Sequence, residues 1–391
     1  MRVCERTNAR RTSSPAGVFI FRKNGLQFRK NFGTTGGGFS GKVVSISSAF
    51  DAKGRECMDK RGSGLTFTDR LEEQVRIKQS RLCLGIDPFF EMMPPHLKRQ
   101  IADGGKSFEA MGELFEQSMV PIIDAAASNV IAAQANLASY LIYGETGLRA
   151  YRRILAHARE RNLLTIGDAK CTEGDHIAEL CADGYLGAVP FWDTPYREPR
   201  GRHESSIQSD AVTVTMAMGS SGMAPFVAAA RERGAGVFVL ARPSFQTNSE
   251  FDLLRVGTHD EFLWEWIGHQ VRKFTKGTEG RYGWWNVGVT CGAKFRGEMR
   301  RLREILPRSW FHVVGFGKQG GTAENAVAAV DNDGLGCLVV STRAIDYAWA
   351  RGPFKRRPEE FAEAAGDAAR AARDDLNRAI ERVLAKRRKL E

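Results

Sequence analysis

The segment LLTIGDAK, residues 163–170, is an apolar run that ends in an aspartate and a lysine. Its apolar residues are consecutive, whereas a strand with one face in water alternates between apolar and polar residues. A consecutive run of this length is typical of a strand in a parallel sheet that is covered on both faces. The segment therefore predicts a buried parallel strand with polar groups at its carboxyl end.

Seven further runs of this kind occur along the chain, and amphipathic helical segments such as GLRAYRRILAHARER (147–161) lie between them. The runs are LCLGID (82–87), NVIAAQAN (129–136), AVTVTM (211–216), GVFVLARPS (236–244), WWNVGVT (284–290), WFHVVGFG (310–317) and CLVVSTR (337–343). Eight strand–helix units in about 270 residues predict a (β/α)8 TIM barrel, an α/β fold. A doubly wound open sheet is the alternative, because a strand count read from one sequence can slip by one or two.

The two ends of the chain differ in composition from this body. Residues 1–57 are rich in Gly, Ser, Arg and Lys and lack periodicity, which predicts a disordered basic extension before a single barrel domain over residues 58–391. Such a start is also typical of an organelle transit peptide, and a dispensable leader or a misassigned start before Met58 are further alternatives. From about residue 357, an Ala-rich, charged segment predicts an extra C-terminal helix outside the barrel.

Charge and composition exclude several classes of function. The extension carries 11 Lys/Arg and 3 Asp/Glu, a net +8 out of the total +11, so the remaining 334 residues carry only +3. That body is not basic enough to predict nucleic-acid binding, and no run of about 18 apolar residues predicts a membrane span. Seven scattered cysteines without a CxxC pair predict reduced thiols in the cytoplasm. Seven histidines without close spacing predict no metal site.

In a (β/α)8 barrel the active site lies at the carboxyl ends of the strands, so the polar residues there are the candidate site residues. They are Asp87, Gln134, Asn136, Asp168, Lys170, Ser244, Thr290, Lys318, Gln319, Gly320, Gly321 and Arg343. Gly320 and Gly321 follow the seventh strand and Arg343 ends the eighth, where this fold usually binds phosphate. Glycines let backbone N–H groups approach an anion, and a guanidinium can bind it through two hydrogen bonds. The alternative is a tight turn beside a surface ion pair.

Asp168 and Lys170 are two residues apart on one strand, so their side chains point to the same face. At the mouth of a barrel, a lysine held by carboxylates can deliver a proton, and an aspartate can press against a substrate anion that disappears in the reaction. The pair suits the formation and protonation of a carbanion. An ordinary salt bridge at the rim is the alternative. A thiol mechanism at Cys171 is disfavoured, because His176 is the only histidine near it in the sequence.

A series of motifs follows one another in a defined order between about residues 66 and 350. The motifs are LCLGIDP, YGETGLRAY, IGDAK followed by GD, DAVTV, GVFVLARPS, VGVT, GFGKQGG and VVSTRAI. In combination they resemble the bacterial long-form orotidine 5′-phosphate decarboxylases. The resemblance implies a (β/α)8 barrel, usually a homodimer with active sites at the interface. It also implies conversion of orotidine 5′-phosphate to uridine 5′-phosphate without a metal or cofactor.

The resemblance further implies roles for individual residues of this chain. Asp168 would crowd the substrate carboxylate, and Lys170 would protonate the carbanion at C6. The residues implied to bind the pyrimidine nucleoside 5′-monophosphate are Asp87 at the ribose hydroxyls, Asn136, Ser244 at the pyrimidine edge, and Gln319, Gly320, Gly321 and Arg343 at the 5′-phosphate.

The chain departs from the family pattern at its catalytic residues. Gln134 stands where the family has a lysine, and losing such a charge can remove ~3 kcal/mol or more of transition-state stabilisation. The family motif is D-x-K-x-x-D, and this chain has two residues inserted after Lys170. Glu173 therefore stands at the position of the motif's last aspartate, while Asp175 keeps the preceding glycine that the family has there. Either could reach the partner's site. Three functions therefore remain open: the decarboxylase, a diverged relative acting on another substituent of a pyrimidine-like nucleotide, and a catalytically silent nucleotide-binding protein.

Overall fold

The computed structural model describes residues 64–103, 107–191, 201–245, 250–258 and 260–389, together with a short hairpin. The hairpin pairs β1 (Ile20–Arg22) with β2 (Gly25–Gln27) in antiparallel fashion. The chain separates into two compact units, Met1–Lys53 and Gly54–Glu391, and the barrel is formed by the second. Apart from the hairpin, the extension predicted for residues 1–57 and the boundary predicted at Met58 lie outside the described residues.

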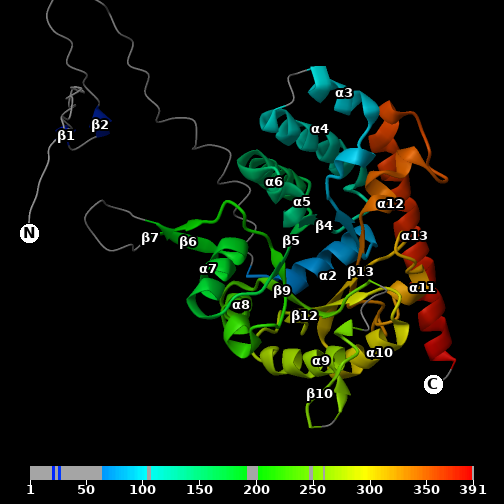
Figure 1. Ribbon diagram of the computed structural model, residues 1–391. Helices are drawn as coiled ribbons and strands as arrows, with labels where there is room; N and C mark the ends of the chain where they lie inside the picture. Colours follow the sequence, from blue (N-terminus) through cyan, green and yellow to red (C-terminus); the bar gives the residue numbers. More distant parts are fainter. Residues whose placement is uncertain are drawn as a thin grey trace, which may run out of the picture. The chain divides into compact units, whose positions relative to one another are not determined.

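Eight parallel strands close into a barrel, in which each strand pairs with the next one of the eight along the chain (Figure 1). They are β3 (Leu82–Gly85), β4 (Ala132–Asn136), β5 (Leu164–Cys171), β8 (Ala211–Val214), β9 (Gly236–Arg242), β12 (Trp285–Gly292), β13 (Ser309–Val314) and β14 (Cys337–Ser341). Each coincides with one of the eight apolar runs. The predicted (β/α)8 barrel is confirmed, and the open-sheet alternative is wrong.

Helices surround the barrel on its outside (Figure 1). They are α3 (Pro95–Asp103), α4 (Phe108–Ala126), α5 (Leu137–Leu141), α6 (Gly144–Glu160), α7 (Asp175–Leu186), α8 (Gly219–Arg233), α9 (Leu263–Phe274), α10 (Arg296–Ile305), α11 (Ala323–Ala326) and α12 (Arg343–Asp346). Two small antiparallel sheets pair β6 (Ala188–Phe191) with β7 (Gly201–Glu204) and β10 (Arg255–Val256) with β11 (Glu261–Phe262). There are also three short 3-10 helices among the described residues, η2 (Phe90–Met92), η4 (Ala348–Ala350) and η5 (Pro358–Glu360).

Helix α2 (Phe67–Lys78) closes the end of the barrel where the strands begin. A capping box between Thr66 and Asp69 starts the helix, and its apolar face packs against the lower interior of the barrel. The Phe67 N–H donates to the Gly234 carbonyl just before β9 at 2.7 Å, and the Thr68 N–H donates to Asn286 at the start of β12 at 3.1 Å. The opposite end, where the strands finish, is here called the mouth.

The predicted C-terminal helix is present as α13 (Phe361–Arg388), which runs along the outside of the barrel beside α4, α11 and α12 (Figure 1). Its buried residues are mostly alanines, which let it pack closely on α4. A Cβ at Gly366 would lie 2.9 Å from the Ala125 carbonyl oxygen, so a glycine is needed at this approach. Within the described part of the chain, no helix is long and apolar enough to cross a membrane.

Candidate active site

Asp168, near the end of β5, is the centre of a polar cluster at the mouth, and its side chain is 8% exposed. The Lys170 Nζ lies 2.7 Å from each of its carboxylate oxygens. The Thr213 hydroxyl donates to Oδ1 at 2.7 Å. The side-chain amides of Gln134 and Asn136 donate to Oδ2 at 3.1 and 3.2 Å. One ammonium and three neutral donors from β4 and β8 therefore hold the carboxylate in place.

The backbone of Lys170 is shaped to bring its amine back to Asp168. Its φ of 47° lies in the left-handed region, which is uncommon for a residue with a side chain. The Lys170 N–H donates to the Thr213 hydroxyl at 3.0 Å, so the same threonine ties both members of the pair. The lysine side chain is 43% exposed. The ammonium is thus fixed by the buried carboxylate, while the rest of the side chain is open to the mouth.

A second layer of polar residues lies behind Gln134. The Gln134 Oε1 accepts a short hydrogen bond from His312 on β13, and the other ring nitrogen of His312 lies 3.0 Å from the Thr290 hydroxyl on β12. All three side chains are buried. Sequence reasoning missed His312 and Thr213. The one available signal was a polar residue inside an otherwise apolar strand, which in most proteins is simply part of the core.

Asp87 follows β3 and lies beside this cluster. Its Oδ1 accepts from the Asn136 N–H at 2.8 Å, and its carbonyl oxygen accepts from the Tyr347 hydroxyl at 3.0 Å. Burial raises the pKa of Asp87 to about 7, and the negative charge of Asp168 adds to this effect. The Asn136 amide and the positive charges of Lys170 and Arg343 oppose the rise.

The raised pKa of Asp87 predicts how its removal changes stability. Between pH 4 and 7 the native state binds this proton more tightly than the unfolded state, so this residue's contribution to stability falls as the pH rises through that range. At pH 8, Asp87→Asn should therefore have a larger free energy of unfolding than the wild type, by at most about 4 kcal/mol, since one pKa unit corresponds to about 1.4 kcal/mol. The variant should accordingly unfold at a higher temperature. Thermal unfolding at pH 5 and pH 8 measures this. An advantage of equal size at both pH values would contradict the prediction.

The glycine-rich turn after β13 lies on the other side of the mouth and is closed by its own backbone. The Gly320 N–H donates to the Gly317 carbonyl at 2.8 Å, and the Gly321 N–H donates to the Gly315 carbonyl at 3.2 Å. The two amides that the sequence predicted for an anion are thus engaged within the turn. Gly320 has a φ of 86°, which explains the glycine there. In this conformation, side chains rather than these amides are left to hold a phosphate.

Three further predicted residues come from this part of the barrel. Arg343 is half-buried at the start of α12, directly after β14. The buried Oε1 of Gln319 has no hydrogen-bond partner among the described residues. It lies beside Gly315, as does the buried Ser244 that follows β9, since a Cβ at Gly315 would lie 2.7 Å from the Gln319 Oε1 and 2.9 Å from the Ser244 Cβ. Sequence reasoning missed Lys294, whose side chain lies against Gly320.

The two acids after Lys170 do not join the cluster. Glu173 and Asp175 are exposed, and within the described chain neither forms an ion pair with Lys170. Asp175 is the first residue of α7. Burial and a hydrogen bond with Cys181 raise the pKa of the Cys171 thiol to about 12, so a thiolate nucleophile next to Lys170 is disfavoured.

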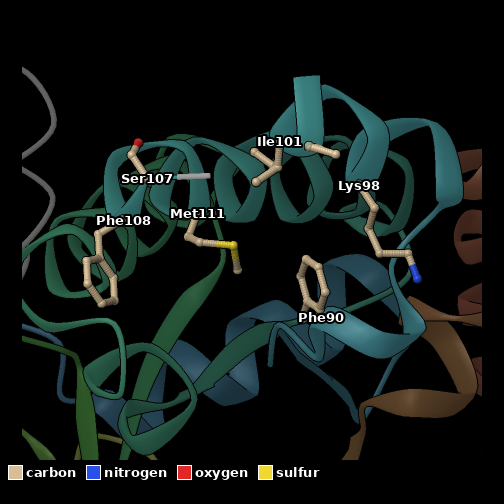
Figure 2. A pocket seen from close by; sticks show the side chains of 7 residues that line it. Phe90, Lys98, Ile101, Ser107, Phe108 and Met111 are labelled. Carbon is tan, nitrogen blue, oxygen red and sulfur yellow. The ribbon is translucent and has the colours of Figure 1, made fainter. Parts of the chain in front are cut away.

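A cavity of about 330 Å³ elsewhere in the molecule lies between η2, α3 and the start of α4 (Figure 2). Its lining consists of Phe90, Lys98, Ile101, Ala102, Ser107, Phe108 and Met111. Lys98 donates to the Glu91 carbonyl at 3.1 Å, and the rest of the lining is mostly apolar. The cavity contains none of the predicted site residues. Among the described residues, no group of His, Cys, Asp and Glu side chains is placed to hold a metal ion.

The fold and the mouth define the class: a (β/α)8-barrel protein with an ammonium–carboxylate pair on one side and a glycine-rich turn with an arginine on the other. No family model matches the chain. It is 30% identical to the orotidine 5′-phosphate decarboxylase of Rhodopirellula baltica over 318 residues, 80% of this chain and 98% of that one. It is also 30% identical to the enzyme of Caldicellulosiruptor bescii over 286 residues, 73% and 90% of the two chains. The chain belongs to the orotidine 5′-phosphate decarboxylase family, which confirms the resemblance of its motifs.

A solved structure agrees on the fold. Leishmania donovani OMP decarboxylase superposes with a TM-score of 0.57 at 21% identity, covering 79% of this chain and 100% of that one.

Proposed function

We propose that this protein is a carboxy-lyase that converts orotidine 5′-phosphate to uridine 5′-phosphate and carbon dioxide, a step of pyrimidine biosynthesis, using only its own side chains. The observation that carries the proposal is the Lys170 amine, 2.7 Å from both oxygens of a buried Asp168 at the mouth. Membership of the decarboxylase family supports the same reaction. This geometry supplies a carboxylate that is fixed before the substrate arrives and a proton donor beside it.

In the proposed reaction, the bond between C6 of the pyrimidine and the carboxylate carbon breaks. Its electron pair stays on C6, carbon dioxide leaves, and Lys170 transfers a proton to C6. Asp168 presses against the substrate carboxylate, a repulsion that is relieved as that negative charge leaves. Lys170 then regains a proton from water through its exposed face.

In the proposed complex, the nucleotide spans the mouth from Asp168 to Arg343. Asp87 and Asn136 hold the ribose hydroxyls, and the hydrogen bonds that join Asp87 to Asn136 and Asn136 to Asp168 support this role. Ser244 contacts the pyrimidine. The 5′-phosphate is bound by Gln319 and Arg343, and by the amides of Gly320 and Gly321 only if the turn opens.

The catalytic set is altered relative to the family in our proposal. Gln134 replaces a lysine and offers Asp168 a neutral amide at 3.1 Å in its place. This replacement favours a second candidate function, a diverged relative that acts on another substituent of a pyrimidine-like nucleotide. A silent nucleotide-binding protein is disfavoured, because it has no need of a lysine clamped to a buried carboxylate. Glu173 or Asp175 would complete the partner's site.

We also propose a homodimer in the cytoplasm. Exposed apolar side chains lie on the segments that follow three consecutive strands, β4, β5 and β8. These side chains are Leu141, Ile142, Ile177, Leu180 and Met218. Apolar residues gathered around the mouth suit an interface with a second subunit. The described cysteines are all free thiols, as expected in a reducing compartment.

The absorbance of orotidine 5′-phosphate tests the proposed reaction. Mixed with the protein, the substrate should lose its orotate band as uridine 5′-phosphate forms, without added metal. If uridine 5′-phosphate binds in calorimetry but the orotate band persists for hours, the decarboxylase is excluded in favour of the other two functions.

A further inference from the structure

We propose that His312 is a positioning residue, which acts through Gln134 to hold the Asp168 carboxylate in its catalytic orientation. The inference rests on the proposed function for its kinetic consequences. The arrangement is particular to this chain, because the residue that His312 contacts is Gln134, which stands where the family has a lysine. The observation that carries it is a continuous line of side-chain hydrogen bonds from Thr290 through His312 and Gln134 to Asp168.

The direction of each hydrogen bond follows from the carboxylate at the end of the line. A carboxylate only accepts, so the Gln134 amide must turn its NH2 group toward Asp168. The Gln134 Oε1 then faces His312, so the histidine Nε2 must carry the proton and donate. The Nδ1 is left as an acceptor for the Thr290 hydroxyl at 3.0 Å. The four residues therefore allow one arrangement of protons.

The imidazole is fixed in place by its surroundings. The ring is 1% exposed and stacks on Phe238, with 5.2 Å between centroids and 30° between planes. Burial lowers the pKa of His312 to about 4, although the negative charge of Asp168 opposes this effect. The ring is neutral at physiological pH and keeps one donor and one acceptor, as the line requires.

Without the histidine, the Gln134 Oε1 loses its hydrogen-bond donor, and Asp168 alone holds the side-chain amide. An amide held at one end only can swing away from the carboxylate, which weakens its hydrogen bond to Asp168. Asp168 would keep Lys170 and Thr213, so the site would form but would be held less firmly on the Gln134 side. His312 therefore acts on the reaction without touching the substrate, by holding Gln134 in place against Asp168.

The kinetic test removes the donor and keeps the ring. His312→Phe preserves an aromatic side chain against Phe238 and should lower kcat by about 10- to 100-fold, as for a small misplacement of catalytic groups. The dissociation constant for uridine 5′-phosphate should change less than about 3-fold, because the phosphate and ribose contacts are untouched. His312→Gln, which retains an NH2 donor, should recover most of the lost kcat. Trp310→Phe, another buried aromatic on the same strand but in the lower interior, is the matched control and should keep kcat.

A double-mutant cycle separates positioning from packing. In a Gln134→Leu background the line is already broken, so adding His312→Phe should reduce kcat no further. If His312→Phe lowers kcat by the same factor with and without Gln134, or if His312→Gln is as slow as His312→Phe, the positioning role is wrong.

A second measurement needs neither a variant nor turnover. The 15N NMR signals of His312 in the full-length wild-type protein should show a protonated Nε2 and an unprotonated Nδ1 at pH 7. The opposite tautomer would overturn the inference. A wild-type protein that lacks decarboxylase activity but shows the expected tautomer would refute the proposed function and leave the hydrogen-bond line intact.

Discussion

Lys170→Ala should lower kcat for orotidine 5′-phosphate by at least about 10³-fold, because the variant loses both its proton donor and the positive charge beside Asp168. The fold should survive, since Thr213, Gln134 and Asn136 still donate to the carboxylate. Decay of the orotate band under saturating substrate measures the loss, and calorimetry with uridine 5′-phosphate shows whether the nucleotide site persists.

Lys170→Arg distinguishes the two roles of this lysine. A guanidinium keeps the positive charge and can pair with Asp168, but in proteins it does not give up a proton. The arginine variant should therefore be nearly as slow as the alanine variant. Recovery of turnover with arginine would mean that the charge suffices and that the proton comes from elsewhere. Wild-type turnover in Lys170→Ala would remove the lysine from the mechanism.

The second large effect is expected at the phosphate end of the site. Arg343→Ala should raise KM and weaken binding of uridine 5′-phosphate by about 100- to 1,000-fold, the range for removing one partner of a charged hydrogen-bonded pair. Binding of uridine, which lacks the phosphate, should change little. Arg357→Ala is a matched control, because that arginine is exposed just before η5 and, among the residues that the structure describes, forms its ion pair with Glu360.

The comparison of the two ligands decides this prediction. If Arg343→Ala weakens uridine and uridine 5′-phosphate equally, Arg343 supports the fold of the mouth and does not bind the phosphate. Lys294, whose side chain lies against Gly320, and Gln319 would then be the next candidates on that side.

The strands and the catalytic pair could be predicted because both depend on local patterns. Buried parallel strands are apolar on both faces, so each left a continuous run in the sequence. Asp168 and Lys170 could be paired from the sequence because residues two apart on a strand share a face, although in the structure a left-handed backbone at Lys170 brings its amine to Asp168. The left-handed backbone at Lys170 was not foreseeable, since the Thr213 hydroxyl that receives its N–H comes from another strand.

The rest of the site depends on contacts between distant parts of the chain. His312 and Gln134 are 178 residues apart, and only closure of the barrel brings their side chains together. The engagement of the Gly320 and Gly321 amides within their turn likewise depends on the path of the backbone, because the same glycines could also cradle an anion. A sequence motif shows which residue types occur in a turn or at a strand end, but it does not show which group each of their polar atoms will bond to in the folded barrel.

Because α2 fills the end of the barrel where the strands begin, ligands have to reach the described site through the mouth. The substrate has to enter, and both products have to leave, by that same route, so the size of each product decides the order in which they can leave. Carbon dioxide is small enough to leave while the nucleotide is still bound, whereas a new substrate molecule can bind only after uridine 5′-phosphate has dissociated. Uridine 5′-phosphate should consequently compete with the substrate, and dissolved carbon dioxide should not.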